Sequence, residues 1–142
     1  MARGYWLVKS EPSTYSWDDM VAAGEDFWDG VRNYQARNNL RAMKRGDRVL
    51  FYHSVKAKAV VGICEVVREH YPDPTTDDER WSVVDLAARH ALKRPVTLAD
   101  IKAAPELAEV ALIKQSRLSV MPVDRAGFER IVELGGGKRA VG

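Results

Sequence analysis

Aromatic, amide and cationic side chains lie close together between Trp28 and Asn38. Capture of one nucleic-acid base needs an apolar surface for stacking, polar groups that read the base edge, and cations or backbone N–H groups for the neighbouring phosphate. Gly30 would let a flat ligand approach the backbone, and Asn33 precedes a predicted helix whose free N–H groups favour an anion. The segment supplies each kind of group: Trp28 for stacking, Asn33, Gln35 and Asn38 as amides, and Arg32 and Arg37 as cations.

Polar residues also follow the apolar runs that we predict to be strands. Residues 9–12 (Lys-Ser-Glu-Pro) come directly after the first run, and residues 52–54 (Tyr-His-Ser) end a later one. Polar groups in such positions can line the mouth of a small barrel. We expect Trp6 to lie near this mouth, and Arg117 and Ser119 to contact a phosphate or a base edge from a late strand.

Each of these residues also has an ordinary structural interpretation. Trp28 could belong to the core, Asn33 could only cap its helix, and a lone histidine such as His53 is more often structural. Arg117 and Ser119 could form a salt bridge and an edge-strand hydrogen bond. A helical stripe of arginines is often only a solvated surface: Arg37, Arg41 and Arg45.

Residues with catalytic chemistry are few, and their spacing matches no enzyme motif that we recognise. The three histidines and one cysteine do not form a metal-binding pattern. The chain contains no phosphate-binding glycine loop, no Gly-x-Ser-x-Gly and no His-Glu-x-x-His. The catalytic alternative is an acid–base set formed by Lys9, Ser10, Glu11 and His53. We expect a non-enzymatic protein with no cofactor and no metal, and an inert Cys64 in mid-strand.

Composition is typical of a globular domain. The chain has 142 residues, of which 46% are hydrophobic and 30% are charged. The net charge is only +2, so a nucleic-acid interface would depend on where the charges are placed. A single cysteine favours a reducing compartment, and neither a secretory signal nor an apolar run of the ~18 residues needed for a membrane span occurs. We expect a monomeric, cytoplasmic protein that does not bind membranes, with one domain over residues 1–136 and a flexible tail over residues 137–142.

Charge is unevenly distributed along the chain. Residues 11–31 contain acids but no Lys or Arg, whereas residues 32–48 contain six basic residues and a single acid. A second acidic stretch, residues 73–79, is rich in Pro and Thr, and we predict an exposed loop there.

Hydrophobic periodicity and capping residues predict interspersed strands and helices. Apolar runs rich in β-formers predict strands over residues 5–9, 48–54, 59–68 and 118–123, with a hairpin turn at residues 55–58. Residues 81–88 suit a strand, although their second half would also suit a helix. Capping residues predict helices over residues 16–23, 34–44 and 97–104 and from residue 124 onward. The predicted N-caps are Ser16, Thr97 and Asp124, and the predicted stop of the second helix is Gly46.

This order of elements does not make a regular β-α-β series, which argues against a doubly wound parallel sheet. The fold class that we predict is α+β: a small, twisted, mostly antiparallel β-barrel with flanking α-helices.

Several longer runs of the sequence resemble the EVE domain family, in the order typical of that family and over nearly the whole chain. They are residues 5–12 (YWLVKSEP), 28–38 (WDGVRNYQARN), 46–54 (GDRVLFYHS), 61–63 (VGI), 71–74 (YPDP) and 117–123 (RLSVMPV). The resemblance implies a PUA-like fold and kinship with YTH domains, which hold a methylated adenine in an aromatic cage. It also implies a protein that reads modified bases, with modified cytosines in DNA as the leading ligands.

Residues and resemblance together predict a module that captures a single, modified base of DNA. The predicted base pocket consists of Trp6, Ser10, Trp28, Gly30, Val31, Asn33, Gln35, Tyr52, His53, Ser54 and Ser119. The predicted phosphate contacts are Lys9, Arg32, Arg37, Asn38 and Arg117. An RNA-binding PUA-like domain is the alternative, because no motif reveals a contact to a 2′-hydroxyl. A pocket for a small molecule or free nucleotide is a further alternative.

Overall fold

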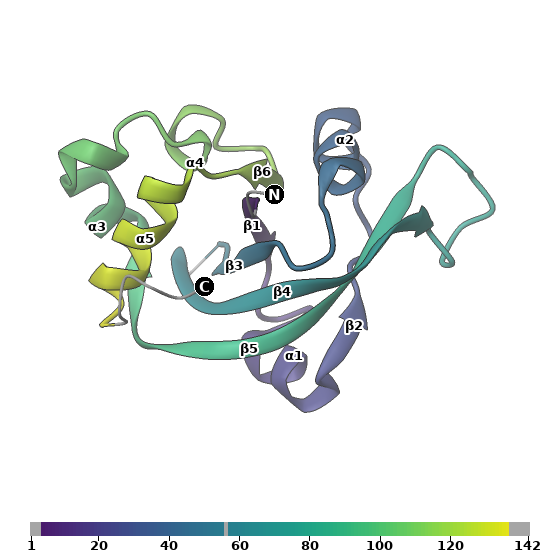
Figure 1. Ribbon diagram of the computed structural model, residues 1–142, viewed down its shortest axis with the longest axis horizontal. Coiled ribbons are helices and arrows are strands. Elements are labelled where there is room, and N and C mark those ends of the chain that lie inside the picture. Colours follow the sequence, from purple (N-terminus) through teal and green to yellow (C-terminus); the bar gives the residue numbers. More distant parts are fainter. Residues whose placement is uncertain (1–3, 56, 137–142) are drawn as a thin grey trace.

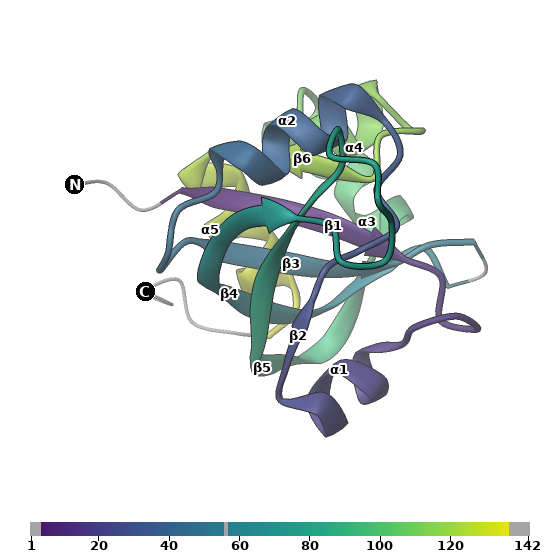
Figure 2. The same cartoon turned by 90° about the vertical axis from the view of Figure 1, so that its right-hand side faces the viewer.

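The computed structural model describes residues 4–55 and 57–136, which form one sheet flanked by helices (Figures 1 and 2). Six strands lie in the order β2-β5-β4-β3-β1-β6. Among these strands only β1 and β3 pair in parallel, and the other neighbours are antiparallel. The predicted α+β class is therefore confirmed. The predicted tail, residues 137–142, lies outside the described residues.

The strands differ greatly in length. They are β1 (Tyr5–Ser10), β2 (Glu25–Phe27), β3 (Arg48–His53), β4 (Ala59–Pro72), β5 (Ser82–Thr97) and β6 (Val120–Pro122). The neighbours Leu7 and Val8 are both buried, which confirms that β1 is covered on both faces. β3 and β4 form the predicted hairpin. Sequence analysis missed β2 and ended β4 and β5 too early, because their extensions are mostly polar and exposed.

β4 and β5 form a long, bent ladder that crosses the width of the molecule in Figure 1. Shifts of register interrupt the pairing at four places between Val60 and Tyr71. Each such irregularity bends the strand and increases its twist. The bend places β2, which pairs with β5, so that its carboxyl end can approach other parts of the sheet.

The sheet is open, so the predicted closed barrel is not confirmed. β2 and β6 are its edges, and no ladder joins them in the part of the chain that the structure describes. Both edge strands have only three residues, and a helix covers one edge. The side-chain amide of Asn39 donates to the carbonyl oxygen of Val120 at 2.7 Å, which protects β6 from further pairing.

The four predicted helices begin where the sequence places them. The observed helices are α1 (Trp17–Ala23), α2 (Tyr34–Ala42), α3 (Leu98–Ala103), the short 3₁₀ helix η1 (Pro105–Leu107), α4 (Ala111–Lys114) and α5 (Arg125–Leu134). Ser16, Thr97 and Asp124 each accept a hydrogen bond from a backbone N–H of the first turn. α2 ends two residues earlier than predicted, and Gly46 instead takes a φ of +95° in the turn before β3. Sequence analysis missed η1 and α4.

The helices lie on both sides of the sheet. Figure 1 shows α3, α4 and α5 grouped together at one end of the molecule, whereas α1 and α2 lie on opposite sides of the sheet.

No helix in the described ranges is long and apolar enough to cross a membrane. Cys64 is fully buried in the core, and burial raises the pKa of its thiol to about 12, so this cysteine is held in its unreactive form.

Close packing of α1 on the sheet depends on Gly62. A Cβ atom at this position would lie 2.5 Å from the indole ring of Trp17, and that ring packs edge-on against Phe51 with 5.4 Å between centroids. We expect Gly62→Ala to lower the free energy of unfolding by about 1–3 kcal/mol in denaturant titrations, because extra atoms in a packed core force strain.

A Trp17→Phe background provides the control for this prediction, because the shorter phenyl ring leaves room for the added methyl group. The cost of Gly62→Ala should be smaller in that background. Equal costs in the two backgrounds would contradict the proposed contact.

Candidate functional site

A cavity of about 660 Å³ opens at the carboxyl end of β1. Its walls come from the end of β1 and the loop that follows, from β2 and the loop that follows, and from the approach to β6. The lining residues are Lys9, Ser10, Glu11, Thr14, Tyr15, Asp26, Phe27, Trp28, Asp29, Gly30, Val31 and Ser119. Three strands separate β1 from β2 in the sheet, so only a strongly bent sheet can bring these two strand ends to one cavity.

Trp28 forms part of the cavity wall and of the core at the same time. It is 8% exposed, and its ring meets Phe51 edge-on at 5.5 Å and Tyr15 edge-on at 6.2 Å between centroids. Its backbone N–H donates to the carbonyl oxygen of Val84 at 2.8 Å. Trp28 is therefore a core residue that also lines the cavity. Its role in stacking on a base stays a prediction.

The end of β2 and the loop after it contribute further residues to the same wall. Phe27 is 38% exposed and lines the cavity beside Trp28. Gly30 has a φ of +76°, and nothing lies within 4 Å of the place where a Cβ would be. The backbone conformation, not crowding, therefore requires glycine here. The end of β2 and the loop after it therefore contribute two aromatic residues to the lining, of which Phe27 is exposed and Trp28 is buried.

Three hydrogen-bonded residues form a polar wall that we call the acceptor wall: Ser10, Tyr15 and Asp26. The Ser10 hydroxyl donates to the carbonyl oxygen of Tyr15. The Tyr15 hydroxyl donates to Asp26 Oδ2 at 2.7 Å, and the backbone N–H of Phe27 donates to Asp26 Oδ1 at 2.9 Å. Burial and the hydrogen bond to Asp26 raise the pKa of the Tyr15 hydroxyl, so this hydroxyl keeps its proton.

Lys9 is the single cation among the lining residues, and its ammonium already has a partner. It donates to the carbonyl oxygen of Ser116 at 2.7 Å and lies 5.8 Å from the centre of the Tyr52 ring. Burial lowers the pKa of Lys9. The lining carboxylates outnumber it: Glu11, Asp26 and Asp29. The cavity therefore suits a neutral group that carries hydrogen-bond donors better than it suits a phosphate.

Trp6 lies at the other end of β1 and does not line this cavity, although we expected it near the mouth. Its indole N–H donates to Asp47 Oδ2 at 2.9 Å. The nearly buried Asp47 carboxylate also accepts the backbone N–H groups of Gly4 and Lys44. Ser10 is four residue steps along the extended strand from Trp6, a distance of about 13 Å. Alternation along a strand fixes which face a residue occupies but not its distance from a site.

Five further residues predicted for the pocket do not line the cavity: Asn33, Gln35, Tyr52, His53 and Ser54. His53 accepts the backbone N–H of Trp17 through Nε2 at 3.0 Å, which satisfies the first N–H of α1. Asn33 caps α2 by accepting the N–H of Ala36 at 2.9 Å. Tyr52 belongs to the core at 3% exposure. For Asn33 and His53 the ordinary structural interpretation is therefore the correct one.

Ser54 and Gln35 lie outside the cavity for different reasons. The backbone N–H of Ser54 donates to the carbonyl oxygen of Ser10 at 2.9 Å, so Ser54 helps to position the end of β1. Gln35 is exposed on α2.

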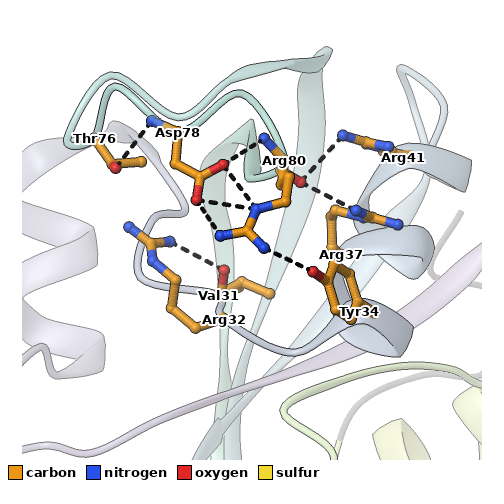
Figure 3. Close-up of polar contacts among 8 residues, drawn as sticks. All are labelled: Val31, Arg32, Tyr34, Arg37, Arg41, Thr76, Asp78 and Arg80. Carbon is orange, nitrogen blue, oxygen red and sulfur yellow. Dashed lines mark hydrogen bonds and ion pairs between the residues drawn. The ribbon is translucent and has the colours of Figure 1, made fainter.

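A second group of side chains lies where the loop between β4 and β5 meets α2 (Figure 3). We call it the arginine cluster: Arg32, Arg37, Arg41 and Arg80. Arg37 Nη1 and Arg41 Nη2 both donate to the carbonyl oxygen of Arg80, each at 3.2 Å. Arg80 Nη1 in turn donates to the Tyr34 hydroxyl at 3.1 Å, and the Tyr34 ring stacks on Trp81 at 5.2 Å between centroids. These contacts tie the loop to α2 from its first turn to its last.

Carboxylates pair with two of the four guanidinium groups within the described residues. Arg80 pairs with Asp78 at 2.6 Å, and Arg32 pairs with Asp73 at 3.0 Å. Arg37 and Arg41 donate only to neutral acceptors there, namely Asn38 Oδ1, Ser82 Oγ and the Arg80 carbonyl oxygen. Two positive charges are thus held side by side without a carboxylate between them.

One residue of the second acidic stretch, Asp73, is buried, although we predicted an exposed loop there. This residue is 2% exposed. Burial alone would raise the pKa of Asp73, but hydrogen bonds from Thr75 and Arg32 outweigh burial and lower it. Asp73 therefore serves to hold Arg32 and the loop in place.

The remaining predicted phosphate contacts occupy separate places. Asn38 Oδ1 accepts from Arg37 Nη2 at 2.8 Å, so Asn38 positions that guanidinium. Arg117 is exposed, two residues before Ser119 of the cavity lining, and makes no hydrogen bond or ion pair with other described residues.

Sequence reasoning missed several residues that the structure brings to these two sites. Tyr15 and Asp26 belong to segments that carry no motif of their own, and nothing in the sequence pairs them. Phe27 adjoins Trp28, which was a usable signal for a second aromatic ring. Arg80 and Trp81 directly follow the acidic stretch, whose negative charges dominate the charge pattern there, so the sequence did not indicate them as site residues.

The four residues of the catalytic alternative already have hydrogen-bond partners outside that set. Ser10 donates to a backbone carbonyl, His53 accepts a backbone N–H, and Glu11 accepts from Ser13 at 2.9 Å. No cluster of three or more His, Cys, Asp or Glu that could hold a metal occurs in residues 4–55 and 57–136.

The fold is that of a small α+β domain, and comparisons with known proteins place the chain in a family. The EVE domain family matches residues 4–134. Thymocyte nuclear protein 1 from Mus musculus is 37% identical over 164 aligned positions, which cover 92% of this chain and 73% of that protein. The chain belongs to the EVE domain family.

Solved structures of relatives share the fold closely. A protein from Rhodopseudomonas palustris is 51% identical with a TM-score of 0.89, covering 94% of this chain and 93% of that one. Human thymocyte nuclear protein 1, solved in complex with DNA containing 5-methylcytosine, is 33% identical with a TM-score of 0.87, covering 95% of this chain and 99% of that one.

The bond between His53 and Trp17 predicts a pH dependence of stability. Burial lowers the pKa of His53 from its ordinary value of 6.5, although the nearby Asp18 carboxylate opposes this shift. The unfolded chain therefore takes up the proton first, so the stabilisation is complete above pH 6.5 and is lost as the pH falls through the pKa of the folded protein. His53→Gln keeps an acceptor for the Trp17 N–H but cannot be protonated.

Denaturant titrations of wild-type protein and His53→Gln at several pH values test this expectation. Relative to the variant, the wild-type protein should lose up to about 1 kcal/mol of unfolding free energy on acidification, the usual net value of one hydrogen bond. Parallel pH profiles for the two proteins would contradict the assigned bond.

Proposed function

We propose that this protein binds DNA without catalysis and reads a modified cytosine. The cavity takes one extruded or unpaired base, and the arginine cluster contacts the phosphates of the same strand.

The cavity and its lining carry the proposal. A volume of about 660 Å³ falls within the range of about 300–1,000 Å³ that is typical of small-ligand sites. Phe27 and Trp28 supply aromatic surface, and the acceptor wall supplies polar atoms at the side. A nucleobase has matching features, since it has two apolar faces for stacking and a polar edge for hydrogen bonds.

The arrangement of charge supports a division of labour between the two sites. Val31 lines the cavity, and Arg32 of the arginine cluster follows it directly in the chain. Arg37 and Arg41 are held close together without a carboxylate, so an anion placed there would relieve their repulsion. A strand whose base entered the cavity could therefore have its phosphates near these guanidinium groups.

The comparison with human thymocyte nuclear protein 1 supports the choice of ligand. That protein was solved with DNA containing 5-methylcytosine. The same ligand class for this chain would require base extrusion or single-stranded DNA, because a base within a duplex is not accessible to a cavity.

Binding to matched oligonucleotides tests the base pocket. We expect the protein to prefer single-stranded DNA with one 5-methylcytosine over the unmodified strand and over the RNA of the same sequence. Phe27→Ala should remove about 1–3 kcal/mol of binding free energy, the usual value of base stacking, as measured by fluorescence anisotropy. Phe27 is 38% exposed, so its removal should leave the protein folded.

Val21→Ala is the matched control, because Val21 is also an exposed apolar residue, at 52%, and does not line the cavity. It should bind as the wild-type protein does. Equal affinity for modified and unmodified strands, together with unchanged binding by Phe27→Ala, would show that the cavity is not a base pocket.

The salt dependence of binding tests the arginine cluster separately. Substitution of both Arg37 and Arg41 by Ala should weaken binding to modified and unmodified strands alike. The slope of log K against log salt should become shallower by about 1.4, because each phosphate contact to a single strand contributes about 0.7.

The double substitution Arg94→Ala and Arg125→Ala removes the same charge from exposed positions outside the cluster. It should change the slope far less. If both double variants flatten the slope equally, binding depends on net charge and not on the arginine cluster.

A further inference from the structure

We propose that Asp26, held in place by Tyr15, accepts a hydrogen bond from the exocyclic amino group of the bound base. This bond would select cytosine or adenine over thymine or uracil. This inference rests on the proposed function of the cavity as a base pocket.

The protons of the acceptor wall are already donated within the protein. The Ser10 hydroxyl donates its proton to the Tyr15 carbonyl oxygen, and the Tyr15 hydroxyl donates its proton to Asp26. A hydroxyl has one proton and two lone pairs. Toward a ligand, both hydroxyls can therefore act only as acceptors while these bonds last.

Asp26 has acceptor capacity left over. Its two oxygens each receive one hydrogen bond, from the Tyr15 hydroxyl and from the backbone N–H of Phe27. An ionised carboxylate offers about four lone-pair positions, so about two remain. Both known donors are neutral groups, and the two bonds hold the carboxylate at two points. Asp26 lines the same cavity as Trp28.

A wall that accepts but does not donate distinguishes bases by the group at one position of the ring. Cytosine carries an amino donor at N4 and adenine carries one at N6, whereas thymine carries an oxygen acceptor at O4. An amino group would satisfy the free lone pairs of Asp26. A keto oxygen would face a carboxylate with no proton between them, which is repulsive and leaves both groups unpaired.

Single-stranded DNA with one central 5-methylcytosine or one central thymine provides matched probes. The two bases share the 5-methyl group and differ in the groups at ring positions 3 and 4. The wild-type protein should bind the 5-methylcytosine strand at least about tenfold more tightly than the thymine strand. Asp26→Asn should reduce this ratio to within about threefold, because the amide can turn an N–H toward the O4 of thymine.

Tyr15→Phe provides a second variant in case Asp26→Asn folds poorly. It keeps the carboxylate but removes the hydroxyl that orients it, so the ratio should fall to an intermediate value.

A second tyrosine–aspartate bond outside the cavity lining supplies the control. The Tyr71 hydroxyl donates to Asp85 Oδ1 at 2.5 Å, and neither residue lines the cavity. Asp85→Asn and Tyr71→Phe remove the same kind of bond and the same charge, and they should leave the base ratio unchanged.

The outcomes separate this inference from the proposed function. A wild-type protein that prefers 5-methylcytosine over unmodified cytosine but binds the thymine strand as tightly would overturn the inference and keep the pocket. The inference also fails if Asp26→Asn keeps the wild-type ratio while folded, or if Asp85→Asn lowers the ratio as much. Binding that ignores the central base altogether would overturn the proposed function itself.

Discussion

Contact between Trp28 and Phe51 is the constraint on which the site depends. Trp28 follows β2 at one edge of the sheet, whereas Phe51 lies on β3, with two strands between β2 and β3, yet their rings are 5.5 Å apart. Register shifts in the β4–β5 ladder bend the sheet enough to permit this contact. The bend brings the end of β1 and the loop after β2 to one cavity, which a flat sheet would keep several strands apart.

In the function that we propose, separation of charge assigns a different ligand to each of the two sites. The cavity is lined by acceptors and carboxylates, and its lysine already donates to a carbonyl oxygen. Arg37 and Arg41 meet instead at a single carbonyl oxygen outside the cavity, where loop and helix join. A chain with a net charge of only +2 can in this way place a neutral base and a phosphate at neighbouring but distinct positions, so that recognition of the base does not depend on overall attraction to a polyanion.

The elements of the fold could be predicted from the sequence because they depend on residues close together in the chain. The contacts between residues far apart in the chain could not be predicted in this way. Caps such as Ser16 and Asp124 define helix starts because they act within one turn. The segment around Trp28 was recognisable because its residue types are close in the chain. Asp26 and Tyr15 could not be paired in advance, since their bond depends on how α1 and β2 pack. Trp6 was misplaced for a related reason: its partner Asp47 lies 41 residues away, and no periodicity reports that contact.

An NMR titration with isotope-labelled protein tests the central claim, that one modified base enters this cavity, most directly. Single-stranded DNA with one 5-methylcytosine should shift the indole N–H signal of Trp28 and the amide signal of Gly30, and the unmodified strand should shift them less. The indole N–H signal of Trp6, which is bonded to Asp47 at the far end of β1, should not move with either strand. Shifts confined to the arginine cluster, and equal for both strands, would contradict the account and leave only attraction to phosphate.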